Sequence, residues 1–169
     1  MNDLRITPVW NITKGGSIDG GSAVHDDVVY FGCCDHNFYA LRVENGAAFW
    51  RFQTDGPAVC LPLVEGGLVF FGSYDGNLYA TNLKGGLVWK FHTNGPTGDY
   101  CLDVQDGVVY VGSCDGNVYA IDASSGKMLW KFMTHGYPTT ATFAGKMLLI
   151  GSYDCHMYAL EKGAGKLVW

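Results

Sequence analysis

The chain repeats one sequence pattern about every 40 residues, and this period constrains its fold more than any other feature. Four glycines that follow apolar runs are spaced by 40, 40 and 39 residues, and five tryptophans by 40, 39, 41 and 39. The glycines are Gly32, Gly72, Gly112 and Gly151, and the tryptophans are Trp10, Trp50, Trp89, Trp130 and Trp169. A period shared by two residue types indicates a repeat architecture in which each unit packs against its neighbours.

Each repeat has the pattern of four short antiparallel strands. An apolar run precedes the glycine (VVYF, LVFF, VVYV or MLLI), which is typical of a strand buried on both faces. A tight turn such as SYDGN follows, then a third strand, a turn that contains glycine, and a fourth strand that carries the tryptophan. No segment has helical periodicity. We therefore predict an all-β fold, a β-propeller with four blades of four antiparallel strands.

Composition and charge exclude several functions. The net charge is −5 and no cluster of Lys or Arg is present, so the chain lacks the basic surface that binds nucleic acids or anionic membranes. No segment has the length and apolar character of a membrane span. The first ten residues, MNDLRITPVW, lack the apolar stretch of a signal peptide, which predicts a cytoplasmic protein whose six cysteines are reduced.

The repeat resembles a known family. The segment 112–130, GSCDGNVYAIDASSGKMLW, is similar to the PQQ-like β-propeller repeat, and the segment 72–89 matches nearly as well. The family includes quinoprotein dehydrogenases, BamB-like scaffolds of outer-membrane assembly, and sensor or interaction domains without a cofactor. The resemblance implies that the outer-strand tryptophans pack between neighbouring blades, as a large indole can.

The number of outer strands raises a question of ring closure. We expect an outer-strand segment at 4–13 and repeats at about 14–50, 51–89, 90–130 and 131–169, which gives five outer strands for four sets of inner strands. Propellers of the family usually have seven or eight blades. Two chains could join as an eight-bladed homodimer, which removes exposed strand edges; alternatively, the chain is part of a longer propeller. The initial Met favours the homodimer.

Cysteine and histidine residues suggest two cofactor sites. In quinoprotein alcohol dehydrogenases of the family, an adjacent-cysteine disulfide covers the cofactor, and Cys33 and Cys34 are adjacent. Their register matches the ordinary turn positions of the other blades, which favours small buried turn residues. Cys33, Cys34 and His36 in the first blade, with Cys155 and His156 in the fourth, also form a weak candidate site for zinc or copper(I), provided that these two blades become neighbours.

An aspartate recurs in each tight turn and defines a candidate binding face. These residues are Asp35, Asp75, Asp115 and Asp154. Asp at this position is expected to bond its own turn rather than to act in catalysis. Asp55, Asn94 and His135 occupy the loops that enter the innermost strands, and should share an acidic to polar face with the turn aspartates. His92 lies in an outer strand, where we expect a surface or packing role.

The predicted function is a non-catalytic scaffold or binding module that uses this face for a protein partner or small ligand. No nucleophile elbow, phosphate loop or zinc-protease motif is present. The blades are also minimal and lack the long insertions in which quinoprotein dehydrogenases hold their calcium and catalytic aspartate. We therefore expect no cofactor. The alternatives are an oxidoreductase that depends on pyrroloquinoline quinone (PQQ) with calcium or on a metal, and a sensor domain of a larger propeller protein.

Overall fold

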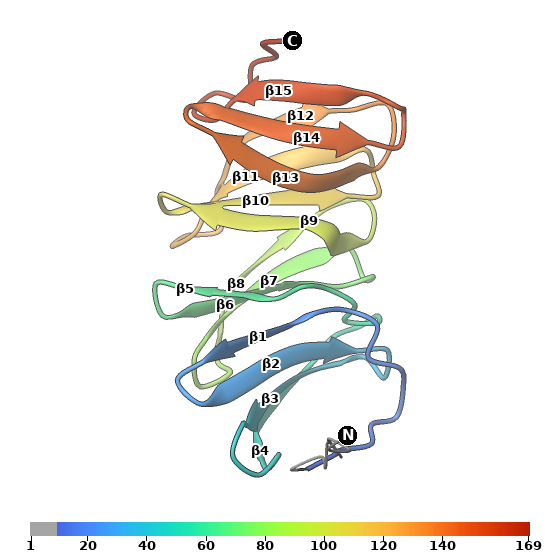
Figure 1. The fold of residues 1–169 in the computed structure, drawn as a ribbon, viewed down its shortest axis with the longest axis vertical. Helices are drawn as coiled ribbons and strands as arrows, with labels where there is room; N and C mark the ends of the chain where they lie inside the picture. Colours follow the sequence, from blue (N-terminus) through green and yellow to red (C-terminus); the bar gives the residue numbers. More distant parts are fainter. Residues whose placement is uncertain (1–9) are drawn as a thin grey trace, which may run out of the picture.

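The computed structural model describes residues 10–169, without the side chains of 98–101 and 140, as four antiparallel sheets (Figure 1). Blades 1 to 3 each have four strands in chain order, and blade 4 has three. Blade 1 contains β1 (Ser22–His25), β2 (Val28–Cys33), β3 (Asn37–Arg42) and β4 (Ala48–Gln53); blade 2 contains β5 (Leu63–Glu65), β6 (Leu68–Gly72), β7 (Asn77–Asn82) and β8 (Leu87–His92). Blade 3 contains β9 (Thr97–Gln105), β10 (Val108–Ser113), β11 (Asn117–Asp122) and β12 (Met128–Met133); blade 4 contains β13 (Pro138–Ala144), β14 (Met147–Ser152) and β15 (Met157–Glu161).

Two predicted boundaries differ from the structure. Each outer strand runs three residues past its tryptophan, because pairing with the third strand continues, as in Asn37 with Gln53. Residues 10–13 do not form the expected outer strand at 4–13. Residues 4–9, and the first residues on which the prediction of no signal peptide depends, lie outside the described part. In blade 4 the outer strand is reduced to a bridge between Leu160 and Leu167. Within residues 10–169, no helix could cross a membrane.

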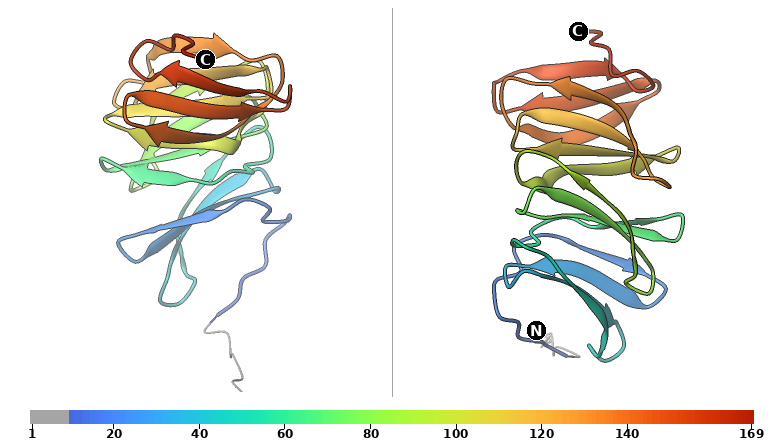
Figure 2. Two further views of the ribbon diagram at one scale, coloured as in Figure 1. Left: turned by 45° about the horizontal axis from the view of Figure 1, so that its top comes forward. Right: turned by 180° about the vertical axis from the view of Figure 1, so that it is seen from behind.

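The four blades stack face to face in chain order (Figures 1 and 2). The first strands of successive blades contact one another, from β1 to β5, β9 and β13. Separate apolar cores fill the spaces between blades 1 and 2, 2 and 3, and 3 and 4. In the first of these, Phe38 stacks on Phe71 with ring centroids 3.8 Å apart. Blades 1 and 4 therefore lie at opposite ends of the stack.

The glycine that ends a central strand allows close approach between blades. A Cβ atom on Gly32 would overlap the carbonyl oxygen of Ala58, which belongs to the loop entering blade 2. Only glycine permits this contact of two backbones. At Gly32, the packing of blade 1 on the loop that enters blade 2 therefore requires glycine.

Four of the five tryptophans contact the glycine turn of the blade that follows them in the chain. The Trp50 indole lies against Gly85, and its Nε1 donates a hydrogen bond of 2.9 Å to the carbonyl oxygen of Leu83. The same contact recurs three times. Trp10 lies on Gly46 and donates to Val43, Trp89 lies on Gly126 and donates to Ala123, and Trp130 lies on Gly165 and donates to Lys162. These bonds identify Val43, Leu83, Ala123 and Lys162 as equivalent positions in the four blades.

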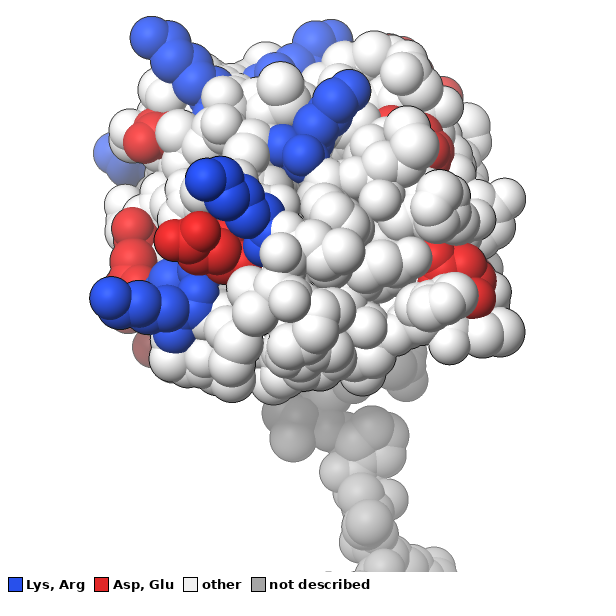
Figure 3. Space-filling model, turned by 90° about the horizontal axis from the view of Figure 1, so that it is seen from above, with Lys and Arg blue, Asp and Glu red and all other residues white. Residues whose placement is uncertain are grey.

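The strand ends form two faces of the stack. We call the loop face the one with the turns between the second and third strands and the loops that join blades, on the right in Figure 1. The hairpin face, on the left, carries the turns between the first and second and between the third and fourth strands. At the blade 4 end of the stack, charged side chains gather mainly over one half (left in Figure 3), while the centre and most of the other half are uncharged.

Candidate functional site

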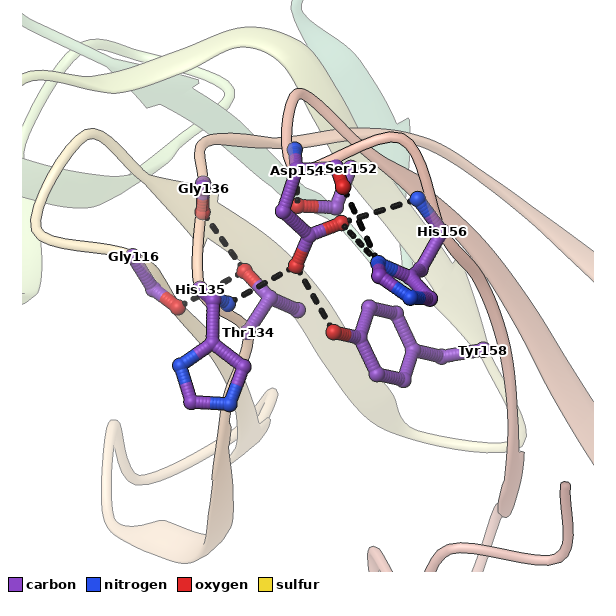
Figure 4. A network of polar contacts seen from close by, with 8 residues as sticks. All are labelled: Gly116, Thr134, His135, Gly136, Ser152, Asp154, His156 and Tyr158. Atoms are coloured by element: carbon purple, nitrogen blue, oxygen red, sulfur yellow. Dashed lines mark hydrogen bonds and ion pairs between the residues drawn. The ribbon is translucent and has the colours of Figure 1, made fainter.

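The loop face is built around the turn aspartates. In blade 4, Asp154 Oδ2 accepts hydrogen bonds from the Tyr158 hydroxyl at 2.7 Å and from the backbone N–H of His135 at 2.9 Å (Figure 4). Its Oδ1 accepts a bond of 2.9 Å from the backbone N–H of His156. The nearby hydroxyl of Thr134 lies within hydrogen-bond distance of two backbone carbonyls. Both carboxylate oxygens of Asp154 thus hold the turn and the entering loop together.

The other three blades repeat this network. The tyrosine two residues after the turn donates to the aspartate at 2.7 Å in each of the pairs Tyr39–Asp35, Tyr79–Asp75 and Tyr119–Asp115. The entering loop supplies a backbone N–H from Gly15, Asp55 or Asn94. The structure thus places Asp55, Asn94 and His135 beside the turn aspartates, joined through their backbone N–H groups.

These hydrogen bonds keep the turn carboxylates ionised. Burial raises the pKa of Asp75 and Asp115, but the bonds from the tyrosines and from the turn outweigh it, so that both pKa values are lowered. The pKa of Asp154 is also lowered, by its bond from Tyr158 in particular, against the opposing effect of desolvation. Burial and the hydrogen bond that Tyr39 donates to Asp35 raise the pKa of Tyr39 to about 12. Four engaged, ionised carboxylates are poorly suited to general acid catalysis.

The turns of blades 1 and 4 differ from those of blades 2 and 3. Gly76 and Gly116 have φ values of 83° and 86°, whereas the equivalent residues His36 and Cys155 adopt φ of 64° and 69°. A residue with a Cβ is strained in this left-handed region. The two end blades therefore carry a local cost in the same turn that the inner blades avoid.

The cysteine and histidine candidates are not brought together. Cys33 is buried and its Sγ donates to the carbonyl oxygen of Gly16, while Cys34 Sγ donates to Asp19, so the two are free thiols and not a disulfide. Cys155 and His156 lie in blade 4, at the opposite end of the stack. Across the described residues, no group of three or more His, Cys, Asp or Glu side chains is placed to hold a metal ion. Within one chain, the described residues therefore do not assemble the candidate zinc or copper(I) site.

Exposed tyrosines on the loop face were missed by sequence reasoning. Tyr137 and Tyr153 are 55% and 67% exposed, and their rings meet edge to face with centroids 6.2 Å apart. Tyr153 precedes the turn aspartate, and its backbone N–H donates to the carbonyl oxygen of Tyr137. Tyr74 has the equivalent position in blade 2 and is also exposed. The available signal was the repeated SYD, in which a large aromatic residue occupies a turn where the pattern requires none.

A shallow hollow of about 390 Å³ lies on the loop face between blades 2 and 3. Tyr74, His92, Asn94 and Pro96 line it. His92 is exposed, with its Nδ1 3.1 Å from Asn77 Oδ1, so it belongs to this surface rather than to the core. The loop face thus offers aromatic, imidazole and amide groups, while the carboxylates of its turn aspartates are already engaged.

Four-stranded antiparallel blades, stacked in chain order, define the chain as a β-propeller protein. The family model described as outer membrane protein assembly factor BamB matches residues 7–104 and 82–169, which together span nearly the whole chain. The chain belongs to this BamB family of PQQ-like repeat proteins. No curated protein matches the chain in sequence.

Solved structures share the fold at low sequence identity. BamB from Moraxella catarrhalis superposes with a TM-score of 0.79 at 21% identity, over 95% of this chain and 52% of BamB. The computationally designed Ika4 protein gives 0.78 at 15% identity, over 88% of this chain and 93% of Ika4. The designed Ika8 protein gives 0.74 at 15% identity, over 82% of this chain and 44% of Ika8. The chain therefore spans about half the length of the BamB structure that it resembles.

Proposed function

We propose that the chain is a non-catalytic scaffold that binds a protein partner through the loop face around Tyr137 and Tyr153. The observation that carries this proposal is the exposed pair of packed tyrosine rings. Tyrosine combines a large apolar ring with a polar hydroxyl, and it is enriched at the energetic centres of protein interfaces. The rings already contact each other, so a partner would meet a partly preorganised surface.

The surroundings of the tyrosine pair favour binding over chemistry. Asp154, the nearest turn carboxylate, is ionised and engaged in hydrogen bonds, whereas His135 and His156 expose their side chains. Imidazole groups add hydrogen-bond donors and acceptors to the rim of an aromatic patch. Such a polar rim around an apolar centre is the usual anatomy of a protein interface.

The competing class is an oxidoreductase that depends on PQQ with calcium. Calcium needs several oxygen ligands that converge on one point. The turn carboxylates instead point into their own turns, and the adjacent pair Cys33 and Cys34 bonds to Gly16 and Asp19. These residues do not fit the quinone and its metal, so the proposal requires no cofactor. Incubation with PQQ and calcium, followed by desalting and a dye-reduction assay, tests this: a retained chromophore with dye reduction would reverse the assignment.

The scaffold proposal is tested by site-dependent capture. Immobilised wild-type protein and the double variant Tyr137→Ala/Tyr153→Ala are exposed to extract from the source cells, and retained proteins are quantified. Leu61→Ala, which removes another exposed apolar side chain, is the matched control. A captured protein is then purified and titrated calorimetrically. We expect the double variant to bind at least about tenfold more weakly, since central interface residues contribute roughly 2 kcal/mol or more. Equal affinity for the double variant and the control would refute the proposal.

We also propose that the blade 4 end of the stack is covered by a second copy, which gives an eight-bladed ring. The positions that pack on the next blade in blades 1 to 3 have no such cover in blade 4: Leu78 is fully buried, whereas the equivalent Met157 is 57% exposed. The half-length match to BamB also supports a ring of twice this length. Light scattering during size-exclusion chromatography should give twice 18.4 kDa; a monomer at all concentrations would exclude the homodimer and leave the longer propeller.

A further inference from the structure

The hairpin face has three equivalent grooves between blades, and one residue position decides how each is filled. This position is the one whose carbonyl oxygen accepts the bond from the preceding tryptophan. Leu83 occupies it between blades 1 and 2, Ala123 between blades 2 and 3, and Lys162 between blades 3 and 4. The three side chains differ in size and charge, so the grooves are not alike.

The groove between blades 3 and 4 is filled by a lysine side chain of the chain itself. Lys162 Nζ donates to Asp106 Oδ2 at 2.6 Å and to Gln105 Oε1 at 2.9 Å, and it lies 5.8 Å from the centroid of the Phe143 ring. The side chain of Lys162 is only 20% exposed. Its stem is covered while its ammonium group meets two oxygens, as long cationic side chains prefer.

The groove between blades 1 and 2 is filled by an apolar side chain. Leu83 packs against the core shared by these blades, together with Val64. Both end grooves are thus closed by the residue at this position, one by a leucine and the other by a lysine.

The groove between blades 2 and 3 is left open. Ala123 is too short to fill it, and a hollow of about 330 Å³ remains. Its apolar wall consists of Leu68, Phe70 and Val104, while Glu65, Asp106 and Asp122 contribute carboxylates. Strand pairing makes Glu65 the equivalent of Gln105, because each pairs with the first residue of the next strand. A carboxylate thus stands where the groove between blades 3 and 4 presents a neutral amide oxygen to the lysine.

We infer that this hollow receives the lysine side chain of a protein partner. The apolar wall would cover its four-carbon stem, and Glu65 would accept its ammonium group as Gln105 accepts that of Lys162. A carboxylate binds an ammonium group more strongly than an amide does. Asp122 is held ionised because the hydroxyls of Ser124 and Ser125 donate to it, which adds negative charge at the rim. The inference rests on the proposed scaffold function, but its site is on the opposite face.

The probes are Nα-acetyl-lysine N-methylamide and the norleucine analogue, which has a similar stem without the ammonium group. The amide signals of Gly66, Gly107 and Ser124 report binding in ¹H–¹⁵N spectra. We expect saturable shifts with the lysine compound and at least about tenfold weaker binding of the norleucine compound. Glu65→Gln should weaken binding of the lysine compound severalfold, while Glu44→Gln, which changes an exposed carboxylate on the blade 1 turn, should leave it unaltered.

Filling the hollow from within gives a second test. Ala123→Lys reproduces the arrangement of Lys162, and Ala123→Leu reproduces that of Leu83; each should abolish binding of the lysine compound. The leucine variant decides the matter if the lysine variant does not fold. Absence of saturable shifts, equal affinity for the norleucine compound, or undiminished binding to Ala123→Leu would overturn the inference. Tyr153→Ala should leave binding of the lysine compound unchanged. A loss of partner binding at the loop face can therefore be distinguished from a loss of lysine binding in the hollow.

Discussion

Blades 2 and 4 carry the same sequence pattern, yet their equivalent residues lie in different environments. Trp89 is 8% exposed against the glycine turn of blade 3, whereas Trp169 is 60% exposed. The turn of blade 2 has Gly76, and that of blade 4 has the strained Cys155. The comparison teaches that the repeat supplies the shape of each blade, while the neighbouring blade determines how much each residue contributes to stability.

The largest predicted difference concerns the tryptophans. Trp89→Ala should lower the free energy of unfolding by about 3–5 kcal/mol, since it removes a buried indole between blades. At concentrations where the chain is monomeric, Trp169→Ala should change it by no more than about 0.5 kcal/mol, as expected for an exposed residue. Urea unfolding followed by far-ultraviolet circular dichroism measures both. If, as proposed, a second copy covers blade 4, the loss for Trp169→Ala should become larger as the protein concentration rises; a loss that stays small at every concentration would contradict that cover.

A smaller difference is expected for the turn aspartates. Asp75→Ala should cost about 2–3 kcal/mol, because the Tyr79 hydroxyl and the backbone N–H of Asn77 lose their acceptor. Asp154→Ala should cost less, because its turn is more exposed to water that replaces the lost bonds. The same urea titrations measure both losses of unfolding free energy. Equal losses for Asp75→Ala and Asp154→Ala would contradict the view that the neighbouring blade determines how much a residue contributes to stability.

The aspartate network also predicts how stability depends on pH. The pKa values of Asp35, Asp75 and Asp115 are lowered in the folded chain, so these groups stabilise it above the ordinary carboxyl pKa of about 4, and this contribution is lost as the pH falls further. The raised pKa of Tyr39, about 12, acts oppositely: its contribution is complete below about pH 10 and is lost as the pH rises toward 12. Unfolding by urea across this range checks both limbs, and Asp75→Asn should flatten the acid limb.

The sequence was sufficient for the features that every repeat shares. Apolar runs, turn chemistry and the tryptophan period predicted the all-β blades, and the family match and the BamB fold confirm the PQQ-like propeller assignment. Features that depend on contacts between separate segments of the chain could not be predicted from the sequence. The pairing of Tyr137 with Tyr153, and the hollow left by Ala123, each require contact distances between segments that are separate in the chain.

For the same reason, the described residues of one chain do not form the candidate metal site. The cysteines and histidines of blades 1 and 4 share a register within the repeat, but sequence register does not bring the two ends of a stack together. Conversely, the size series of Leu83, Ala123 and Lys162 was visible in the aligned repeats. The sequence could not show that these residues fill the grooves between blades, because the contacts of Lys162 with Gln105 and Asp106 of the preceding blade are visible only in the structure.

The smallest predicted effect is that of exchanging the turn residues between an inner blade and an end blade. Cys155→Gly should stabilise the chain by about 0.5–1 kcal/mol, because glycine adopts a φ of 69° without strain and the exposed Cys155 side chain is not packed in the core. Gly76→Ala should destabilise by about 1 kcal/mol or more, because its new Cβ would lie 3.0 Å from the carbonyl oxygen of Thr93 at a φ of 83°. Paired urea titrations measure the two shifts. Loss of stability in Cys155→Gly would show that the thiol contributes a contact in solution, and would make the end-blade turn a site to test for partner binding.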